Sequence, residues 1–324
     1  MVIYFIFHMK ILVTGGAGFI GSHLVDYLIE KGHTVVVVDS LIDGYVDNIQ
    51  PRIDEGKCSF IEGDIRDKKL MLEDLDKTDM IYHMAADPDV KSSVRNPMNS
   101  YDHNMNGTLN VLEYARKHNI KKMIFASSGG TVYGEVDKFP IEEDTPLRPI
   151  SPYGASKAAG EMYLSAYGHA YEMKIAAVRY ANIFGERSRH GVGWDFYHKL
   201  KENPDELTIL GDGTQQKSYL HVSDCVRATV LAGESLENQE KWYEYYNVGS
   251  EDWHTVKQIA RIYEETLDLE GVEHKFTGGK KGWKGDVAKT LLSLEKIKTI
   301  GFEPQVSFEE AVQRYCDWID EFES

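Results

Sequence analysis

The chain has few cysteines, no excess of basic residues and no long apolar run, and each shortage excludes a class of protein. Its three cysteines, Cys58, Cys225 and Cys316, lie far apart and form no CxxC or metal-ligand spacing. Neither a disulfide framework nor a metal site is therefore predicted. With 52 acidic against 36 basic side chains, the formal net charge is −16. Broad nucleic-acid or anionic-membrane surfaces need clustered positive charge, so we expect neither kind of partner.

The apolar opening MVIYFIFHMK is also too short for a membrane segment. A membrane-spanning helix needs about 20 apolar residues. The opening lacks the basic region and the small-residue cleavage site of a secretory signal. Residues 1–8 are predicted either to extend the first strand or to precede a natural start at Met9. We expect a cytoplasmic protein, because sparse, unpaired cysteines favour a reducing compartment.

Short apolar stretches alternate with helical patterns through the first half of the chain, which is typical of an α/β protein. The stretch HTVVVVD at 33–39 is almost entirely β-branched, as expected for a strand covered on both faces. Strands that alternate with helices form a doubly wound parallel sheet of Rossmann type, because right-handed crossovers place helices on both faces. The predicted strands are 10–15, 33–39, 58–64, 80–86, 121–128 and 174–182, and the main predicted helices are 19–32, 106–119 and 156–171.

After about residue 182 the pattern becomes irregular and rich in glycine. Ligands of parallel sheets bind outside the carboxyl ends of the strands, so we expect a smaller mixed α/β lobe to close over that edge. The predicted division is a cofactor-binding Rossmann domain at 9–181, with a return segment around 218–250, and a substrate-binding lobe formed by 182–217 and 251–324.

The motif TGGAGFIG follows the first predicted strand and opens the first helix. Its glycines Gly15, Gly18 and Gly21 would permit a tight turn and a close approach of the backbone to a pyrophosphate at the helix N-terminus. Asp39 ends the next strand and would accept hydrogen bonds from two ribose hydroxyls, while it would repel a 2′-phosphate. NAD is therefore predicted in preference to NADP. The alternative is that Asp39 only caps a turn.

Other strand ends carry residues that could contact a dinucleotide. Asp64 and Ile65 could flank the adenine, and the small residues Ala85 and Ala86 would let the cofactor lie against the backbone. Core packing is the alternative for the two alanines. The remaining predicted cofactor residues are Phe19, Ile20, Asn104, Ser127 and Tyr180.

The segment SPYGASK places Tyr153 and Lys157 four residues apart at the start of a predicted helix, so both side chains should lie on one face. An ammonium beside a phenol favours the phenolate, so the lysine is expected to lower the pKa of the tyrosine from its usual value near 10. Tyr153 is therefore a candidate base, and both residues are also candidate cofactor contacts.

Nine segments follow the order found in a known family. They are TGGAGFIGSHL, VVVVD, GDIRD, HMAA, VYG, SPYGASK, RYANIFG, GDGTQQKSYLHVSD and KGDV. From about residue 9 to the C-terminus the chain resembles the extended short-chain dehydrogenases/reductases, in the nucleotide-sugar epimerase group of UDP-glucose 4-epimerase. The resemblance implies tightly held NAD, removal of the sugar 4-hydroxyl proton by Tyr153, and reversible transfer of the C4 hydride through a 4-keto sugar. Lys157 would also hold the nicotinamide ribose.

The chain departs from the family at the catalytic serine or threonine, where Gly129 stands. Ser128 and Thr131 are the neighbouring candidates, and the resemblance slightly favours Thr131. A purely structural role, with both hydroxyls bonded to the backbone, is the alternative. Related dehydratases carry an Asp-Glu pair where this chain has Gly130 and Thr131, and related decarboxylases carry a glutamate at the Thr131 position. Because these carboxylates are missing, the resemblance favours epimerisation over water loss and decarboxylation.

Family positions that hold the substrate diphosphate fall on Asn182 and Lys217, the latter in place of an arginine. Lysine cannot make the bidentate fork of arginine, so a looser or shared grip is expected. A second family arginine is replaced by Trp283. Lys281 or Lys284 could supply the charge instead, and Lys281 is preferred. Arg187, Arg189 and His190 lie in a glycine-flanked loop that could close on the ligand. A solvated surface charge is the alternative for each lysine.

The sequence therefore predicts an NAD-dependent isomerase that interconverts UDP-glucose and UDP-galactose. Alternatives are an epimerase of N-acetylated or uronic UDP-sugars, a reductase of a nucleotide-linked keto sugar, and a non-catalytic NAD-sensing protein. The resemblance also implies a homodimer formed through helices of the first lobe, including the helix that follows Tyr153.

Overall fold

The structure is a computed structural model that describes residues 8–279, 282–283 and 285–324. Its centre is a seven-stranded sheet in the order β11-β6-β5-β4-β1-β2-β3, and every neighbouring pair is parallel. The predicted doubly wound α/β fold is therefore confirmed. The strands of this sheet are β1 (Lys10–Thr14), β2 (Thr34–Asp39), β3 (Cys58–Glu62), β4 (Met80–His83), β5 (Lys122–Ser128), β6 (Lys174–Tyr180) and β11 (Tyr243–Val248).

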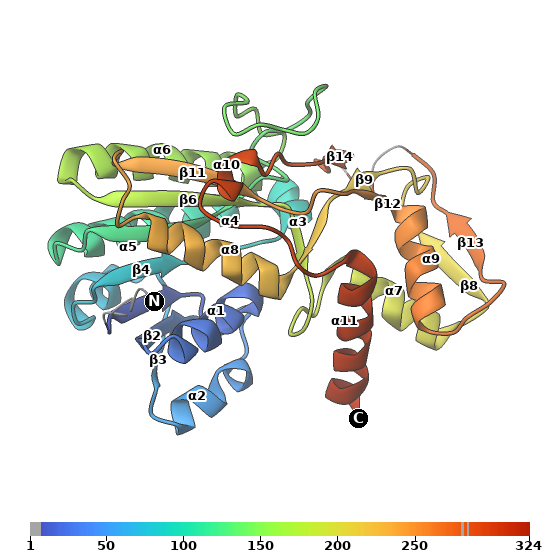
Figure 1. Ribbon diagram of the computed structural model, residues 1–324, viewed down its shortest axis with the longest axis horizontal. Coiled ribbons are helices and arrows are strands. Elements are labelled where there is room, and N and C mark those ends of the chain that lie inside the picture. Colours follow the sequence, from blue (N-terminus) through green and yellow to red (C-terminus); the bar gives the residue numbers. More distant parts are fainter. Residues whose placement is uncertain (1–7, 280–281, 284) are drawn as a thin grey trace, which may run out of the picture.

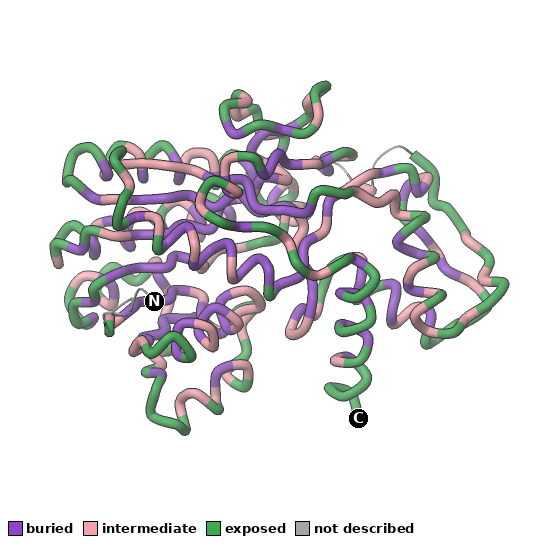
Figure 2. Tube along the Cα trace, in the orientation of Figure 1, coloured by how far each residue is buried: buried purple, intermediate pink, exposed green. Residues whose placement is uncertain are grey.

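Alternate residues of the central strands enter two different cores. Along β1, Ile11 and Val13 belong to the core under α1 and α8, whereas Leu12 belongs to the core under α5 and α6. Both sets are fully buried, which explains why the strands are apolar without alternation. Figure 2 shows the buried positions running along the central strands, with exposed positions gathered in the outer loops and helix ends.

Helices cover the two faces of this sheet and build most of the second lobe. They are α1 (Phe19–Glu30), α2 (Gln50–Asp54), α3 (Val90–Arg95), α4 (Pro97–Ser100), α5 (Gly107–Lys117), α6 (Pro152–Tyr171), α7 (Gly191–Glu202), α8 (Val222–Ser235), α9 (Val256–Thr266), α10 (Glu295–Lys298) and α11 (Phe308–Glu323), with a short 3₁₀ helix η1 (Val46–Asn48) and two short π-helices, η2 (Leu70–Asp74) and η3 (Tyr101–Asn106). Within the described ranges, none of these helices is both long and apolar enough to cross a membrane.

The second lobe has its own apolar core, to which α7, α9 and α11 contribute. Figure 1 shows these helices together with β8 and β13 as a group beside the central sheet. Its strands form small sheets of two or three members. They are β7 (Asn182–Phe184) with β10 (Tyr219–His221), β8 (Glu206–Ile209) with β13 (Glu273–Phe276), and β9 (Gln216–Lys217) with β12 (His254–Thr255) and β14 (Lys289–Thr290).

The chain returns to the first lobe before it completes the second. After β10, helix α8 packs on the core that it shares with α1, and β11 pairs with β6 as the last strand of the central sheet. The predicted return segment around 218–250 therefore contains one helix, α8, and one strand, β11, that join the first lobe. The predicted strand 174–182 is divided at Ala181, so that β6 stays in the central sheet and β7 leads into the second lobe.

Candidate active site

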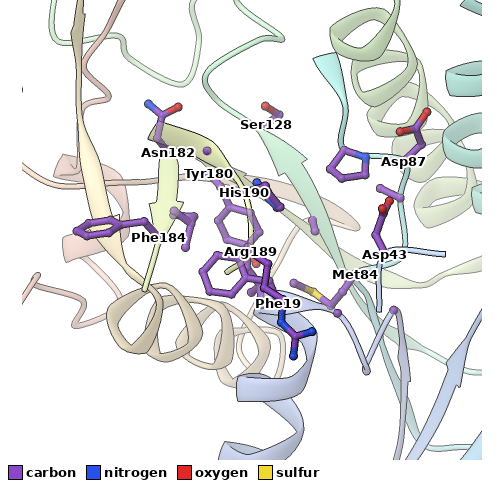
Figure 3. Close-up of a pocket in the computed structure, with 18 of the residues that line it drawn as sticks. Phe19, Asp43, Met84, Asp87, Ser128, Tyr180, Asn182, Phe184, Arg189 and His190 are labelled. Carbon is purple, nitrogen blue, oxygen red and sulfur yellow. The ribbon is translucent and has the colours of Figure 1, made fainter. Parts of the chain in front are cut away.

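A cavity of about 1080 Å³ lies at the carboxyl ends of β1, β2, β4, β5 and β6, and both lobes contribute to its walls. Figure 3 shows Phe19 and Met84 on the side of the first lobe, facing Asn182 and Phe184 from β7. The cavity thus occupies the edge at which ligands of parallel sheets bind.

The turn between β1 and α1 requires glycine at two of the predicted positions. A Cβ atom on Gly15 would lie 2.6 Å from the backbone nitrogen of Ala85, and Gly15 has a φ of +70°. A Cβ atom on Gly21 would lie 2.0 Å from the carbonyl oxygen of Gly15. Gly18 precedes α1 and has no side chain with which to cap the helix. The N-terminal N–H groups of α1 are therefore available to an anion, and the turn fits a pyrophosphate.

Asp39 lies in the cavity wall and also closes the loop behind it. Its two carboxylate oxygens accept hydrogen bonds from the backbone N–H groups of Ala17 and Leu41, each at 2.9 Å. Burial raises the pKa of Asp39, and these backbone bonds offset part of the rise. Turn closure and a role in ribose binding are compatible, because each carboxylate oxygen has a further lone pair.

All the predicted cofactor residues except Asn104 line the cavity. Asp64 also holds Arg66 through contacts of 2.5 to 3.0 Å. Asn104 departs from the prediction, because it is buried behind the wall, where its amide binds the backbone of Asp87 and donates to Ser156 at 3.0 Å. The predicted cofactor residues that line the cavity are Gly15, Gly18, Phe19, Ile20, Gly21, Asp39, Asp64, Ile65, Ala85, Ala86, Ser127, Tyr153, Lys157 and Tyr180.

Tyr153 and Lys157 lie on consecutive turns of α6 and both line the cavity. Lys157 donates from Nζ to the carbonyl oxygen of Ala126 at 2.9 Å, and Nζ is 6.0 Å from the centre of the Tyr153 ring. Burial lowers the pKa of Lys157 to about 8. The pKa of Tyr153 is raised to about 12, because burial outweighs a hydrogen bond with Ser128. The prediction that Lys157 lowers the pKa of Tyr153 in the ligand-free chain is therefore wrong, since the ammonium is directed at a carbonyl group and burial dominates.

Of the two candidate hydroxyl residues, Ser128 at the end of β5 lines the cavity and Thr131 does not. Thr131 lies behind it and donates from Oγ1 to Ser128 Oγ at 2.9 Å. Position 129 faces the packed interior, since a Cβ atom there would lie 2.5 Å from Leu292 Cδ1 and 2.9 Å from the carbonyl oxygen of Arg179. The geometry thus favours Ser128 over Thr131, and the arrangement of Ser128 beside Tyr153 is suited to proton transfer at a substrate hydroxyl.

Three of the predicted substrate residues, Asn182, Arg187 and Lys217, line the cavity. Lys217 lies 2.7 Å from Asp286, and Arg187 lies 2.8 Å from Asp26, so each cation already has an acidic partner. Arg187 Nη1 is nevertheless buried without a hydrogen-bond partner in the described part of the chain. Lys281 lies outside the described residues.

Arg189 and His190 belong to the same loop before α7 as Arg187, and they also line the cavity, although only Arg187 was named as a substrate contact. The Arg189 guanidinium stacks 3.6 Å from the ring centre of Tyr45 and 4.3 Å from that of Phe322. Gly191 to Gly193, the first turn of α7, lie in the wall as well. The signal available in the sequence was the run of basic residues between a strand and a glycine-rich helix start.

The far end of the cavity is aromatic, with rings from Phe184, Tyr219, Tyr263, Phe308 and Tyr315. Such rings could pack on a flat base or a sugar. Across residues 8–279, 282–283 and 285–324, no group of three or more His, Cys, Asp or Glu side chains is arranged to hold a metal ion.

Comparison with known proteins agrees with this geometry. Residues 11–249 match the model of the NAD dependent epimerase/dehydratase family. A protein of Methanocaldococcus jannaschii named putative UDP-glucose 4-epimerase is 37% identical over 318 residues, which cover 95% of this chain and 98% of that protein.

Two solved structures have the same fold over nearly their whole length. The UDP-glucose 4-epimerase of Thermotoga maritima with UDP-glucose has a TM-score of 0.88 and 37% identity, and the match covers 98% of this chain and 100% of that one. The UDP-glucose 4-epimerase of Thermus thermophilus in complex with NAD has a TM-score of 0.85 and 36% identity, with coverage of 96% and 99%.

Proposed function

The chain belongs to the NAD dependent epimerase/dehydratase family, and from this premise we propose that it is an NAD-dependent UDP-sugar 4-epimerase that interconverts UDP-glucose and UDP-galactose. The observation that carries the proposal is the meeting of Tyr153, Lys157 and Ser128 in one cavity with the glycine turn and Asp39. A proton-transfer site and a dinucleotide cradle together are what this reaction requires.

The residues present fit NAD. Gly15 and Gly21 leave the space in which a side chain would block the backbone, α1 offers free N–H groups, and Asp39 supplies an anionic acceptor for ribose hydroxyls. NAD⁺ would supply a hydride acceptor and the positive charge of its nicotinamide ring. Lys157, which is buried beside Tyr153, would hold a ribose hydroxyl through Nζ.

Tyr153 would take the proton of the sugar 4-hydroxyl at its phenolic oxygen and return it in the second half of the reaction. Ser128 would donate a hydrogen bond to the reacting oxygen and orient it toward Tyr153. Because burial raises the pKa of Tyr153 to about 12, the phenolate needs added positive charge in the loaded cavity. The wide cavity gives a 4-keto sugar room to turn while its nucleotide stays bound.

The substrate diphosphate would be held by the second lobe. Asn182 at the start of β7, Lys217 on β9 and the first turn of α7 all line the cavity. N–H groups at the N-terminus of a helix favour a phosphate without needing a large positive net charge. This arrangement agrees with an acidic protein that binds an anionic ligand, and it supports a grip shared between Lys217 and Arg187.

Water loss is not the favoured activity. Gly130 and Thr131 stand where the resemblance places the acid pair of dehydratases, and the Thr131 hydroxyl is directed at Ser128. Neither residue can supply a carboxylate for removal of a hydroxyl group. Reversible proton and hydride transfer at one carbon needs no such pair.

We further propose a homodimer that forms through α6, and a cytoplasmic location. Met162 and Tyr163 are large apolar residues that are 56% and 46% exposed. Ala155, Ala159 and Ala166 share their face at helical spacing, so the face is apolar and closely approachable. Light scattering of the purified chain tests the dimer, and a monomer at working concentrations contradicts it.

The activity is tested by proton NMR of the purified protein with UDP-galactose, with and without added NAD⁺. We expect UDP-glucose to appear without net reduction of the cofactor. Net consumption of reduced cofactor would instead identify a reductase. Conversion of N-acetylated or uronic UDP-sugars alone would correct the sugar, and no conversion across the panel by protein that binds NAD would favour the NAD-sensing alternative.

A further inference from the structure

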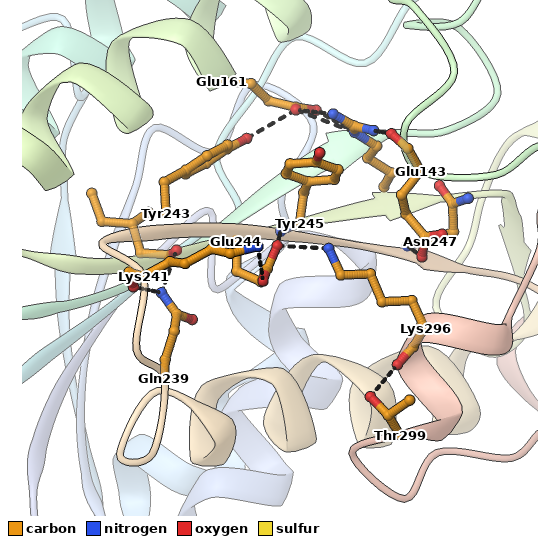
Figure 4. A network of polar contacts seen from close by, with 12 residues as sticks. Glu143, Glu161, Gln239, Lys241, Tyr243, Glu244, Tyr245, Asn247, Lys296 and Thr299 are labelled. Carbon is orange, nitrogen blue, oxygen red and sulfur yellow. Dashed lines mark hydrogen bonds and ion pairs between the residues drawn. The ribbon is translucent and has the colours of Figure 1, made fainter.

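A fully buried carboxylate lies one helical turn beyond Lys157 and is not used by the proposed reaction. Glu161 has no exposed surface, and it belongs to the same face of α6 as Tyr153 and Lys157 because the three are four residues apart. Its carboxylate accepts hydrogen bonds from Ser127 Oγ at 2.5 Å and from Tyr243 Oη at 2.9 Å. Figure 4 shows Tyr243 reaching Glu161 from β11.

This face of α6 contacts each of the last three residues of β5. Tyr153 forms a hydrogen bond with Ser128, Lys157 donates to the carbonyl oxygen of Ala126, and Glu161 accepts from Ser127. The strand end that carries the cavity hydroxyl is therefore fastened to the helix that carries the base by three successive contacts. Loss of the contact between Glu161 and Ser127 would let α6 and the end of β5 move apart at the other two contacts.

Glu161 is also part of a buried ion pair. Arg179 on β6 donates to its carboxylate at 2.6 to 3.2 Å, and the same guanidinium donates to Tyr133 Oη and to the carbonyl oxygen of Glu143, each at 2.8 Å. A buried ion pair by itself is weak evidence of stabilisation, because an apolar pair of similar volume often serves as well. A role beyond packing is needed to explain why a charge is kept here.

That role follows from the charges around Lys157. Burial lowers the pKa of Lys157, while Asp87 and Glu161 raise it. His83 on β4 also faces this lysine, and its own pKa is lowered to about 3 by burial and by the Lys157 charge, so His83 adds no positive charge at neutral pH. Asp87 lines the open cavity, whereas Glu161 is sealed behind it. Asp87 has the larger effect on Lys157, and the Glu161 charge is partly offset by Arg179 at 2.6 Å, but Glu161 acts from the closed interior, where solvent screens its charge least.

We propose that Glu161 is a positioning residue, which keeps the Lys157 ammonium charged and the end of β5 in place for the reaction at Tyr153. This inference rests on the proposed role of the Tyr153–Lys157 pair. It assigns the buried network a part in turnover as well as in folding.

The test is a direct titration of Lys157 in the NAD-bound protein, by NMR of chains labelled with ¹³C at the lysine ε-carbon and with Lys157→Arg used for assignment. Glu161→Gln alone would leave Arg179 unpaired and could unfold the protein, so the main variant is the neutral pair Glu161→Gln/Arg179→Met. We expect Lys157 to titrate below its wild-type value, because Glu161 is one of the two acids that raise the pKa of Lys157 and Asp87 remains in the variant. The alkaline limb of the kcat profile should move with it, while KM for UDP-galactose stays within about twofold because no diphosphate contact is lost.

Two matched controls separate the parts of the proposal. Tyr243→Phe removes a hydrogen bond from the same carboxylate but leaves its charge, so Lys157 should titrate as in the wild type. Ser127→Ala removes the hydrogen bond that joins β5 to Glu161 and leaves the Glu161 charge in place, so kcat should fall without a shift of the Lys157 titration.

A folded Glu161→Gln/Arg179→Met variant in which Lys157 titrates as in the wild type overturns the electrostatic role, as does an equal shift in Tyr243→Phe. Wild-type kcat in Ser127→Ala overturns the fastening role. The Lys157 titration needs no turnover. If the wild type shows no epimerase activity but the variant still shifts the Lys157 titration, the proposed function is rejected and the electrostatic role of Glu161 is retained.

Discussion

Asp39→Asn should reverse much of the preference for NAD over NADP, because a single carboxylate both favours the ribose hydroxyls and repels a phosphate. A hydrogen bond to a charged group contributes about 1.5–3 kcal/mol. Each 1.4 kcal/mol is a factor of about ten in affinity, so the Kd for NAD should rise about tenfold or more. Two like charges 4 Å apart at an effective dielectric constant of 20 repel by about 4 kcal/mol, so removal of the charge should lower the Kd for NADP.

The same substitution has a cost in stability that must be measured beside binding. Both oxygens of Asp39 accept backbone N–H groups at 2.9 Å, and the amide nitrogen of asparagine must face one of those two donors. One lost bond of this kind costs about 1.5–3 kcal/mol. Burial raises the pKa of Asp39 despite these bonds, so removal of the charge recovers some desolvation energy. The loss of unfolding free energy should therefore lie toward the lower end of this range.

Asp43→Asn is the matched control, because it removes an equal charge from the same cavity wall and leaves the bonds to Ala17 and Leu41 intact. Titration of cofactor-free protein by calorimetry gives both dissociation constants, and urea unfolding gives the stability. Equal changes in the affinities for NAD and NADP would refute the ribose assignment. A selectivity change as large in Asp43→Asn would transfer that role to the neighbouring loop.

Three further outcomes are expected. Tyr153→Phe should lower kcat by about a hundredfold or more while the Kd for NAD changes little, which single-turnover kinetics and calorimetry check; substantial residual turnover would exclude Tyr153 as the base. Ser128→Ala should lower kcat more than Thr131→Val, because only Ser128 lines the cavity, and the reverse order would favour Thr131. Burial alone would raise the pKa of Glu186, but His221 at 3.0 Å outweighs burial and the pKa is lowered to about 2. A depressed acid pKa stabilises the fold above the unfolded pKa, and this gain is lost as the pH falls through the folded pKa. The unfolding free energies of wild type and Glu186→Gln should therefore approach each other as the pH falls from about 5.5 toward 2; parallel curves would contradict this.

Much of the central sheet could be predicted because local pattern and tertiary environment agree there. The run of valines in β2 is buried on both faces, and the sequence shows this directly. β11 was not predicted, since its sequence YEYYNV mixes aromatic and polar residues and gains its place only by pairing with β6. The predicted strand 80–86 ends early at His83, because Ala85 and Ala86 are used as cavity wall and not as sheet.

The site could be predicted only in part, because some of its contacts join segments that are far apart in the sequence. The spacing of Tyr153 and Lys157 is local and could be read from the sequence, whereas the stacking of Arg189 between Tyr45 and Phe322 joins three separate parts of the chain. Gly129 is a further case, because the reason for its missing side chain is Leu292, far along the sequence. No local pattern contains that information.

The position of the cavity hydroxyl shows how a short turn decides chemistry. After β5 the backbone N–H groups of Thr131 and Val132 both donate to the carbonyl oxygen of Ser128, at 3.1 and 3.0 Å. This closure folds the chain back at Gly129 and Gly130, so Thr131 Oγ1 meets Ser128 Oγ instead of the cavity. The resemblance to the family favoured Thr131, but a resemblance in sequence does not contain the hydrogen bonds that close this turn. The hydrogen bonds that close the turn leave Ser128 as the hydroxyl beside Tyr153, with Thr131 as the donor that orients it.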